Sequence, residues 1–130
     1  MDSKQPTTHR LYGLVGYPLG HSFSRRFFNE KFAAENIDAE YVNFEIADID
    51  ALPGIIAAHP ELCGFNVTIP HKENVMPLLT GIDPHAAEIG AVNVVKVKRK
   101  PDGTAELYGY NTAVTGFAAA IRRLMSPRPA

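Results

Sequence analysis

Short apolar runs rich in β-branched and aromatic residues alternate along this chain with segments that have the apolar spacing of helices. Because successive parallel strands need a crossover between them, this alternation predicts the α/β class. We expect a three-layer sandwich, in which a mainly parallel sheet carries crossover helices on both faces and an antiparallel hairpin at one edge. The predicted strands are residues 11–16, 41–46, 64–69, 91–98 and 105–110.

The segments between these strands carry the usual signals for helix starts and turns. Ser22 or Ser24 could cap the first helix. The apolar stripe of that helix comprises Phe27, Phe28, Phe32 and Ala33. Further helices are predicted from Asp48 or Asp50 to residue 58, and over residues 72–79, 83–89 and 112–125. A turn at Pro101-Asp102-Gly103 joins the last two strands into the hairpin.

The length and charge of the chain bound its organisation and its partners. A chain of 130 residues supports one domain with a hydrophobic core, which we place at residues 11–125, between a polar tail (1–10) and a linker or truncated end (126–130). The net charge is −1, from 13 lysines and arginines and 14 aspartates and glutamates. This balance gives no reason to expect nucleic acid or an anionic membrane as partner, so we expect a small-molecule ligand. The lysine-rich hairpin favours a monomer.

The chain contains one cysteine, Cys63, which excludes an intramolecular disulfide and a multi-cysteine zinc site. It lies beside an apolar run, where we expect a buried and unreactive thiol. No apolar stretch is long enough to span a membrane, and residues 1–10 lack the hydrophobic segment of a signal peptide. The expected location is therefore the cytoplasm.

The run from Gly64 to Lys72 places a lysine directly after a predicted buried strand, in the first turn of a predicted helix. The positive end of a helix dipole disfavours a cation, so a purely structural lysine would be expected nearer the other end. The position of Lys72 therefore indicates a role toward a ligand. Asn66 and Thr68 precede it at alternate positions of the strand, which would place both side chains on one face. They could also simply bond neighbouring backbone groups.

Three more polar clusters stand at predicted strand ends or helix starts, and open α/β sheets bind ligands beyond the carboxyl ends of their parallel strands. Ser22 and Ser24 could both face a carboxylate or a polyol, or could serve as helix caps. Asn93 lies within an apolar strand and could be a buried structural amide or a ligand donor. Asn111 or Thr112 could cap the last helix. The four clusters could converge on one pocket.

Four motifs carry these clusters along the chain. They are GYPLGHSFS at residues 16–24, NVTIPHK at 66–72, GAVNVV at 90–95 and GYNT at 109–112. In this order they resemble the shikimate dehydrogenase family, and specifically its N-terminal substrate-binding domain. The resemblance extends from about residue 11 to residue 124.

The resemblance implies a role for each matching residue. Ser22 and Ser24 would bind the substrate carboxylate. Contacts to the ring hydroxyls would come from Thr68, Lys72 and Asn93. Lys72 would also be the catalytic acid and base, and Asn66 a supporting residue. The resemblance gives no catalytic role to His71, which we expect at the surface of a helix start.

The activity implied by the resemblance is the NADP-dependent interconversion of 3-dehydroshikimate and shikimate, an oxidoreductase step of the shikimate pathway toward chorismate and the aromatic amino acids. Hydride would pass between NADPH and a ring carbon while Lys72 moves a proton at the adjoining oxygen. This scheme needs no metal. The family binds NADP on a second domain, and this chain contains no Gly-x-Gly-x-x-Gly after a strand, so we expect the nucleotide-binding domain to be missing from it.

The chain also departs from the family pattern within the substrate domain. The family's Asn-Thr-Asp motif, whose aspartate pairs with the catalytic lysine, reads here Asn111-Thr112-Ala113. Arg25 and Phe28 stand where the family often has proline and histidine, which leaves the choice between shikimate and quinate open. Without the nucleotide-binding domain and without the aspartate, the chain alone is expected to be inactive. The alternatives are a catalytically silent binding or assembly module, or a domain of the methylenetetrahydrofolate dehydrogenase type, which lacks these motifs together.

Overall fold

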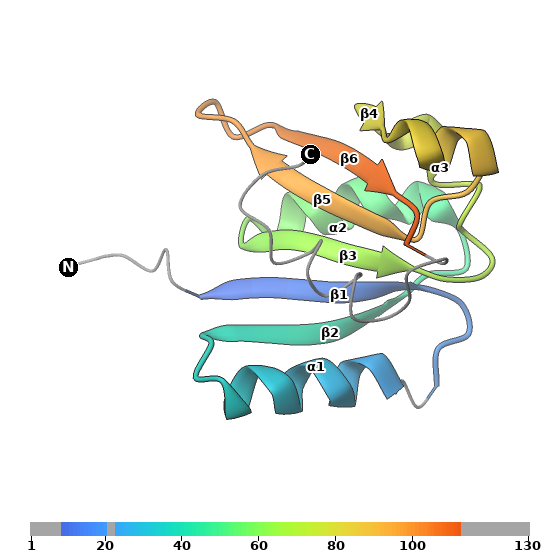
Figure 1. Ribbon diagram of the computed structural model, residues 1–130. Coiled ribbons are helices and arrows are strands. Elements are labelled where there is room, and N and C mark those ends of the chain that lie inside the picture. The colour runs from blue at the N-terminus through green and yellow to red at the C-terminus, as the bar shows by residue number, and fades with distance from the viewer. Residues whose placement is uncertain (1–8, 21–22, 113–130) are drawn as a thin grey trace.

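The apolar runs pair into one six-stranded sheet in the computed structural model, which describes residues 9–20 and 23–112 (Figure 1). The strands lie in the order β2-β1-β3-β5-β6-β4. Their bounds are Arg10–Gly16 (β1), Ala39–Glu45 (β2), Leu62–Val67 (β3), Gly81–Ile82 (β4), Val94–Arg99 (β5) and Ala105–Tyr110 (β6).

The sheet combines a parallel half with an antiparallel hairpin. Strands β2, β1 and β3 are parallel, and Leu14 of β1 is aligned with Asn43 on one side and with Asn66 on the other. Strand β5 runs antiparallel to β3 and forms the hairpin with β6, while β4 pairs parallel with β6 at the outer edge. The predicted α/β class is confirmed. The short β4, which the sequence analysis did not include, lies beyond the hairpin.

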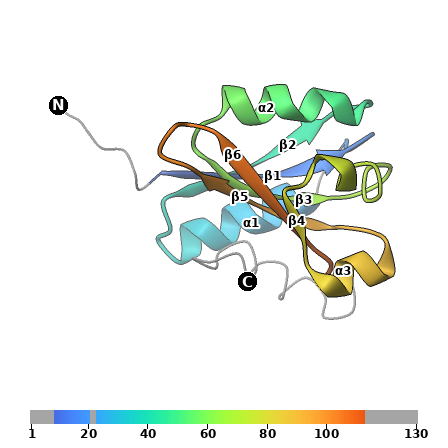
Figure 2. The same cartoon turned by 90° about the horizontal axis from the view of Figure 1, so that it is seen from above.

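Helices cover both faces of the sheet. Figure 2 shows α1 (Phe23–Ala34) and α2 (Leu52–Ala58) on opposite sides, with α3 (Pro84–Ile89) near the end of β6. Each face has its own core. The core on the α2 side includes Leu52, Ile56, Phe65, Val92 and Val95. The core on the α1 side contains Tyr12, Phe28, Phe32, Tyr41, Val94 and Tyr110.

The structure shows how α1 and the segment leading into α2 begin. Asp48, rather than Asp50, caps the 3₁₀ turn η3 (Ile49–Ala51) that leads into α2, because its side chain accepts a hydrogen bond from the backbone of residue 50. Helix α1 begins at Phe23, so Ser24 lies inside the helix and is not its cap. The apolar stripe of α1 is buried at Phe28 and Phe32 as predicted.

The predicted placement of Ala33 on that stripe is wrong, because Ala33 is exposed. In an α-helix each residue is turned by about 100° from the one before it. Phe32 points into the core, so its direct neighbour is turned away from the sheet.

Residues 72–79 do not form the predicted α-helix. Residues 72–75 are turns, and only Met76–Leu78 (η4) is helical, as a 3₁₀ turn in which the N–H of Met76 bonds to the carbonyl of Glu73 at 3.1 Å. Pro77 has no N–H and cannot donate to a carbonyl four residues back, so the α-helical pattern stops. Lys72 therefore stands in a turn, and the argument from a helix dipole does not apply to it.

Three predicted segments lie wholly or mostly outside the described residues: the polar tail at 1–10, the last helix at 112–125 and the end at 126–130. Among the helices that the structure describes, none has the length and apolar character needed to cross a membrane.

Candidate functional site

The strand ends that carry the sequence motifs meet at one edge of the sheet. Here β3 ends, β5 begins and β6 ends, on the right-hand side of Figure 1. The N–H of Val67 donates to the carbonyl of Asn93 at 2.9 Å, and the N–H of Asn93 donates to the carbonyl of Tyr110 at 2.9 Å. Residues far apart in the chain are thus held within one backbone hydrogen bond of each other.

Lys72 joins this edge through its backbone. Its carbonyl accepts a hydrogen bond from the N–H of Val92 at 2.8 Å, which fixes the turn that carries it against the segment before Asn93. The side chain of Lys72 is half-buried. Within residues 9–20 and 23–112, no carboxylate or hydrogen-bond acceptor is paired with its ammonium group. Its ammonium group therefore has no pairing partner in the part of the chain that the structure describes.

One atom of the Asn93 side-chain amide, Oδ1, forms hydrogen bonds within the protein. It accepts from the backbone N–H of Thr112 at 2.9 Å and from the Thr112 hydroxyl at 3.4 Å. Nδ2 has no partner among the described residues. Asn111 donates through its side chain to the carbonyl of Ala91 at 3.0 Å, so it also holds this segment in place. The structural role that the sequence left open is therefore shown for the oxygen of Asn93, and a ligand role for its NH₂ group stays a prediction.

Asn66 is held in a similar way by a residue that the sequence analysis placed only in a strand. The hydroxyl of Tyr41, on β2, donates to Oδ1 of Asn66 at 2.8 Å. Tyr41 is fully buried, and this burial raises the pKa of its hydroxyl far above the usual value, while an interaction with the Ser24 side chain lowers it in part. The hydroxyl therefore stays protonated and acts as a donor. Nothing in the local pattern of β2 signals this contact.

Thr68 follows β3 directly and is held by two backbone bonds. Its N–H donates to Val15 at 2.9 Å, and its carbonyl accepts from His71 at 3.0 Å. The hydroxyl of Thr68 has no recorded partner within the described residues. Gly16, at the end of β1, allows this turn to come close: a Cβ at Gly16 would lie 2.4 Å from Cγ2 of Thr68 and 2.9 Å from the carbonyl oxygen of Ile69.

The predicted surface position of His71 is wrong. His71 is 1% exposed, and its Nε2 lies 2.7 Å from the carbonyl oxygen of Ile46, which follows β2. A ring nitrogen at this distance from a carbonyl oxygen acts as the hydrogen-bond donor, so Nε2 donates, while Nδ1 is buried without a partner among the described residues. His71 therefore ties the loop after β3 to the end of β2. It supports the turn that presents Lys72.

Two of the predicted site residues, Ser22 and Ala113, lie outside the described residues. Cys63, on β3, is half-buried, and burial raises the pKa of its thiol, which favours the unreactive form. In the part of the chain that the structure describes, no three His, Cys, Asp or Glu side chains gather as they would around a metal ion.

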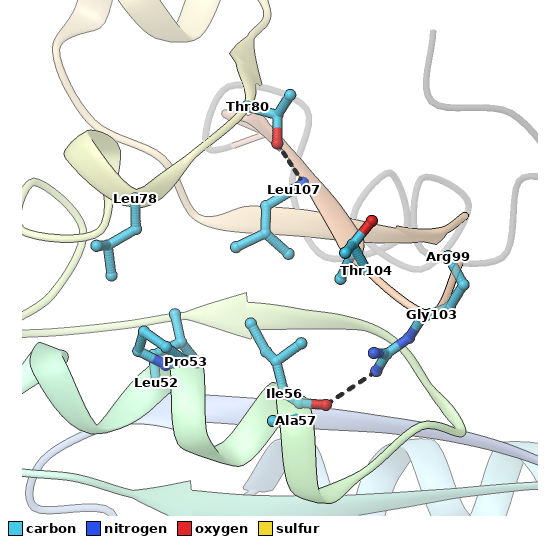
Figure 3. Close-up of a pocket in the computed structure, with 11 residues that line it drawn as sticks. Leu52, Pro53, Ile56, Ala57, Leu78, Thr80, Arg99, Gly103, Thr104 and Leu107 are labelled. Atoms are coloured by element: carbon cyan, nitrogen blue, oxygen red, sulfur yellow. Dashed lines mark hydrogen bonds between the residues drawn. The ribbon is translucent and has the colours of Figure 1, made fainter. Parts of the chain in front are cut away.

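A separate cavity of about 370 Å³ lies on the face of the sheet that α2 covers, between α2 and the hairpin (Figure 3). Its walls are mostly apolar and include Ile56, Leu78 and Leu107. Arg99 stands at one end, where its Nη2 donates to the carbonyls of Ile56 at 3.1 Å and His59 at 2.7 Å. Of the residues predicted to bind substrate that the structure describes, none lines this cavity.

The fold and this edge define an α/β domain that presents amide, hydroxyl and ammonium groups where its strands end, an arrangement suited to a small polar molecule. The chain matches the family model described as shikimate dehydrogenase substrate binding domain over residues 14–95. The chain therefore belongs to the shikimate dehydrogenase family and contains its substrate-binding domain, as the four motifs predicted.

Similar proteins agree with this assignment. The chain is 42% identical over 120 residues to an NADP(+) shikimate dehydrogenase of Bacillus cereus, a match that covers 90% of this chain and 41% of the relative. The structure of shikimate dehydrogenase 1 from Peptoclostridium difficile superposes with a TM-score of 0.71 at 40% identity, covering 85% of this chain and 39% of that one.

A third relative has been solved with a ligand. It is the shikimate 5-dehydrogenase of Thermus thermophilus in complex with shikimate, with a TM-score of 0.69 and 29% identity over 87% of this chain and 42% of that chain. The chain described here spans about two fifths of the length of the relatives that it matches.

Proposed function

We propose that this chain is the substrate-binding part of an NADP-dependent shikimate dehydrogenase and that it binds shikimate or 3-dehydroshikimate at the edge where β3, β5 and β6 meet. One observation carries the proposal. Polar groups of Asn66, Thr68, Lys72 and Asn93 lie at or beside this edge without partners among the described residues. Polar groups at a protein surface that are fixed but unpaired are available to a ligand.

The chemistry of these groups matches that of shikimate, which carries a carboxylate and three ring hydroxyls. The Nδ2 atoms of Asn66 and Asn93 are donors, the Thr68 hydroxyl can donate or accept, and Lys72 brings a positive charge. By the family resemblance, Ser24 and Ser22 would bind the carboxylate. Ser24 lies in the first turn of α1, at the positive end of the helix dipole, which favours an anion.

Lys72 is the proposed acid and base. Its ammonium would donate a proton to the ring oxygen in one direction, and the neutral amine would take it back in the other. In the family an aspartate pairs with this lysine, and the present chain has Ala113 at that position. The missing carboxylate would remove both an orienting partner for Lys72 and an acceptor for a substrate hydroxyl, so we expect weak binding and little or no turnover.

The relatives are NADP(+) enzymes, and NADPH would supply the hydride in the complete reaction. The described residues of this chain do not fit a dinucleotide. The loop from β1 to α1 has Gly16 and Gly20 four residues apart, with Tyr17 and Pro18 between them, rather than the closely spaced glycines that let a backbone approach a pyrophosphate. We therefore assign no step with the nucleotide to this chain.

Calorimetric titration of the chain with shikimate tests the proposal. We expect saturable binding that weakens in Lys72→Ala and tightens in Ala113→Asp. Lys98→Ala removes an equal charge from an exposed position of β5 and should bind like the wild type. Binding that is absent from the wild type and from Ala113→Asp would reject the proposal and favour a module without a working pocket. Equal weakening in Lys98→Ala would show that charge alone, and not Lys72, attracts the ligand.

A further inference from the structure

The hydroxyl of Tyr41 connects the aromatic core under α1 with the polar edge of the sheet. Its ring stacks on Phe28, with centroids 4.4 Å apart and planes 9° apart. The side-chain amide of Asn29, also on α1, accepts from the N–H of Tyr41 at 2.8 Å and donates to its carbonyl at 2.9 Å. Helix α1 thus fixes both the ring and the backbone of Tyr41, which gives its hydroxyl a defined position.

A buried tyrosine hydroxyl at this position needs an explanation. Phenylalanine would fill the same space and stack on Phe28 without the cost of removing a hydroxyl from water. The hydroxyl of Tyr41 recovers this cost by donating to Oδ1 of Asn66 at 2.8 Å. It also interacts with the side chain of Ser24, at the start of α1. One hydroxyl therefore links two of the residues that we assign to the ligand site.

We propose that Tyr41 is a positioning residue of the substrate site and acts by setting the orientation of the Asn66 amide. This inference rests on the proposed function. Because Oδ1 of Asn66 accepts from the hydroxyl of Tyr41, Nδ2 points away from Tyr41. Nδ2 has no partner among the described residues. Asn66 is 9% exposed, so a small part of this residue reaches the surface of the edge. An amide without such an anchor could present either its oxygen or its nitrogen to a ligand.

The experiment compares Tyr41→Phe with a matched control, Tyr12→Phe. Tyr12 is also buried, lies on the same face and is aligned with Tyr41 on the neighbouring strand, but among the described residues the hydroxyl that donates to Asn66 is that of Tyr41. Two quantities are measured in the full 130-residue chain: the dissociation constant for shikimate, and the NMR resonances of the Asn66 side-chain NH₂ group, identified by their loss in Asn66→Asp.

We expect Tyr41→Phe to raise the dissociation constant by about 2- to 12-fold, the range that follows from losing one net hydrogen bond. In an Asn66→Ala background the same change should have a much smaller effect, because the residue that Tyr41 orients is gone. The NH₂ resonances of Asn66 should move in Tyr41→Phe and stay nearly unchanged in Tyr12→Phe. Equal effects of the two tyrosine variants, or full additivity with Asn66→Ala, would overturn the inference.

The NMR measurement separates this inference from the proposed function, because it needs no ligand. If neither the wild type nor Ala113→Asp binds shikimate, the proposed function fails, but the Asn66 resonances still show whether Tyr41 orients the amide. Resonances that do not move in Tyr41→Phe would refute the role of Tyr41 even in a chain that binds shikimate well.

Discussion

The side-chain oxygen of Asn93 accepts a hydrogen bond from the backbone N–H of Thr112 at 2.9 Å, and this bond joins the start of β5 to the chain after β6. The backbone of Asn93 also bonds to Val67 and to Tyr110, so this one residue connects three strand ends. An asparagine suits the position because its amide can accept from the chain with one atom and donate to a ligand with the other.

The first prediction tests the structural function of Asn93. Asn93→Ala should lower the free energy of unfolding by about 1–2 kcal/mol, because the N–H of Thr112 loses its acceptor. Asn93→Asp retains an acceptor oxygen and should stay close to the wild type, although it lacks the NH₂ group. Urea unfolding at neutral pH measures both variants. An equal loss of unfolding free energy in Asn93→Ala and Asn93→Asp would show that the bond to Thr112 does not contribute to stability.

The second prediction concerns the close approach at Gly16. In Gly16→Ala the new Cβ would lie 2.9 Å from the carbonyl oxygen of Ile69, so the backbone of the turn must move. We expect a loss of about 1–3 kcal/mol in unfolding free energy, together with weaker binding of shikimate because Thr68 is displaced. Chemical denaturation and calorimetric titration measure the two effects.

Gly54→Ala is the control for this substitution. Gly54 lies in α2 and has no atom within 4 Å of a new Cβ. Alanine should stabilise the helix there by about 0.5–1 kcal/mol, since it restricts the unfolded chain more than glycine does. A Gly16→Ala variant that is as stable as the wild type would mean that the turn after β3 can move without cost.

Much of this fold could be predicted from the sequence because its signals are local. Alternating apolar runs identified five strands, and Asp83 and Pro84 identified the start of α3. The helix predicted at 72–79 failed because Pro77 removes a backbone donor in the middle of the segment. The strand β4 has two residues, too few for any periodicity to appear.

The site was predicted less completely, because part of it depends on contacts between distant segments. The motifs indicate Asn66, Thr68, Lys72 and Asn93 by residue type and order, and their role toward a ligand stays a prediction. The roles of Tyr41 and His71 depend on partners 25 residues away in the chain, which no local pattern encodes. A buried polar side chain is recognised only when the three-dimensional arrangement shows which group it bonds.

The third prediction tests His71 as a buried support of the site. His71→Leu replaces the imidazole with an apolar side chain of similar volume and leaves the carbonyl of Ile46 without its donor. We expect the free energy of unfolding to fall by about 1–3 kcal/mol. His85→Leu is the control, since His85 is exposed at the start of α3 and should change stability by less than about 0.5 kcal/mol. If both variants are equally stable in urea, the hydrogen bond to Ile46 makes no net contribution to the free energy of unfolding.

The fourth prediction is that stability falls at alkaline pH. Burial raises the pKa of Tyr41 well above its usual value, and that of Tyr12 as well. Tyrosines of the unfolded chain ionise near pH 10, so above this pH the unfolded chain binds fewer protons than the native state. The stabilising effect is complete below about pH 10 and is lost as the pH rises toward the native pKa.

Urea unfolding between pH 8 and 11 should show this decline, and Tyr41→Phe should reduce its slope by up to roughly 1 kcal/mol per pH unit. An unchanged slope in Tyr41→Phe would mean that Tyr41 ionises in the native state as readily as in the unfolded chain.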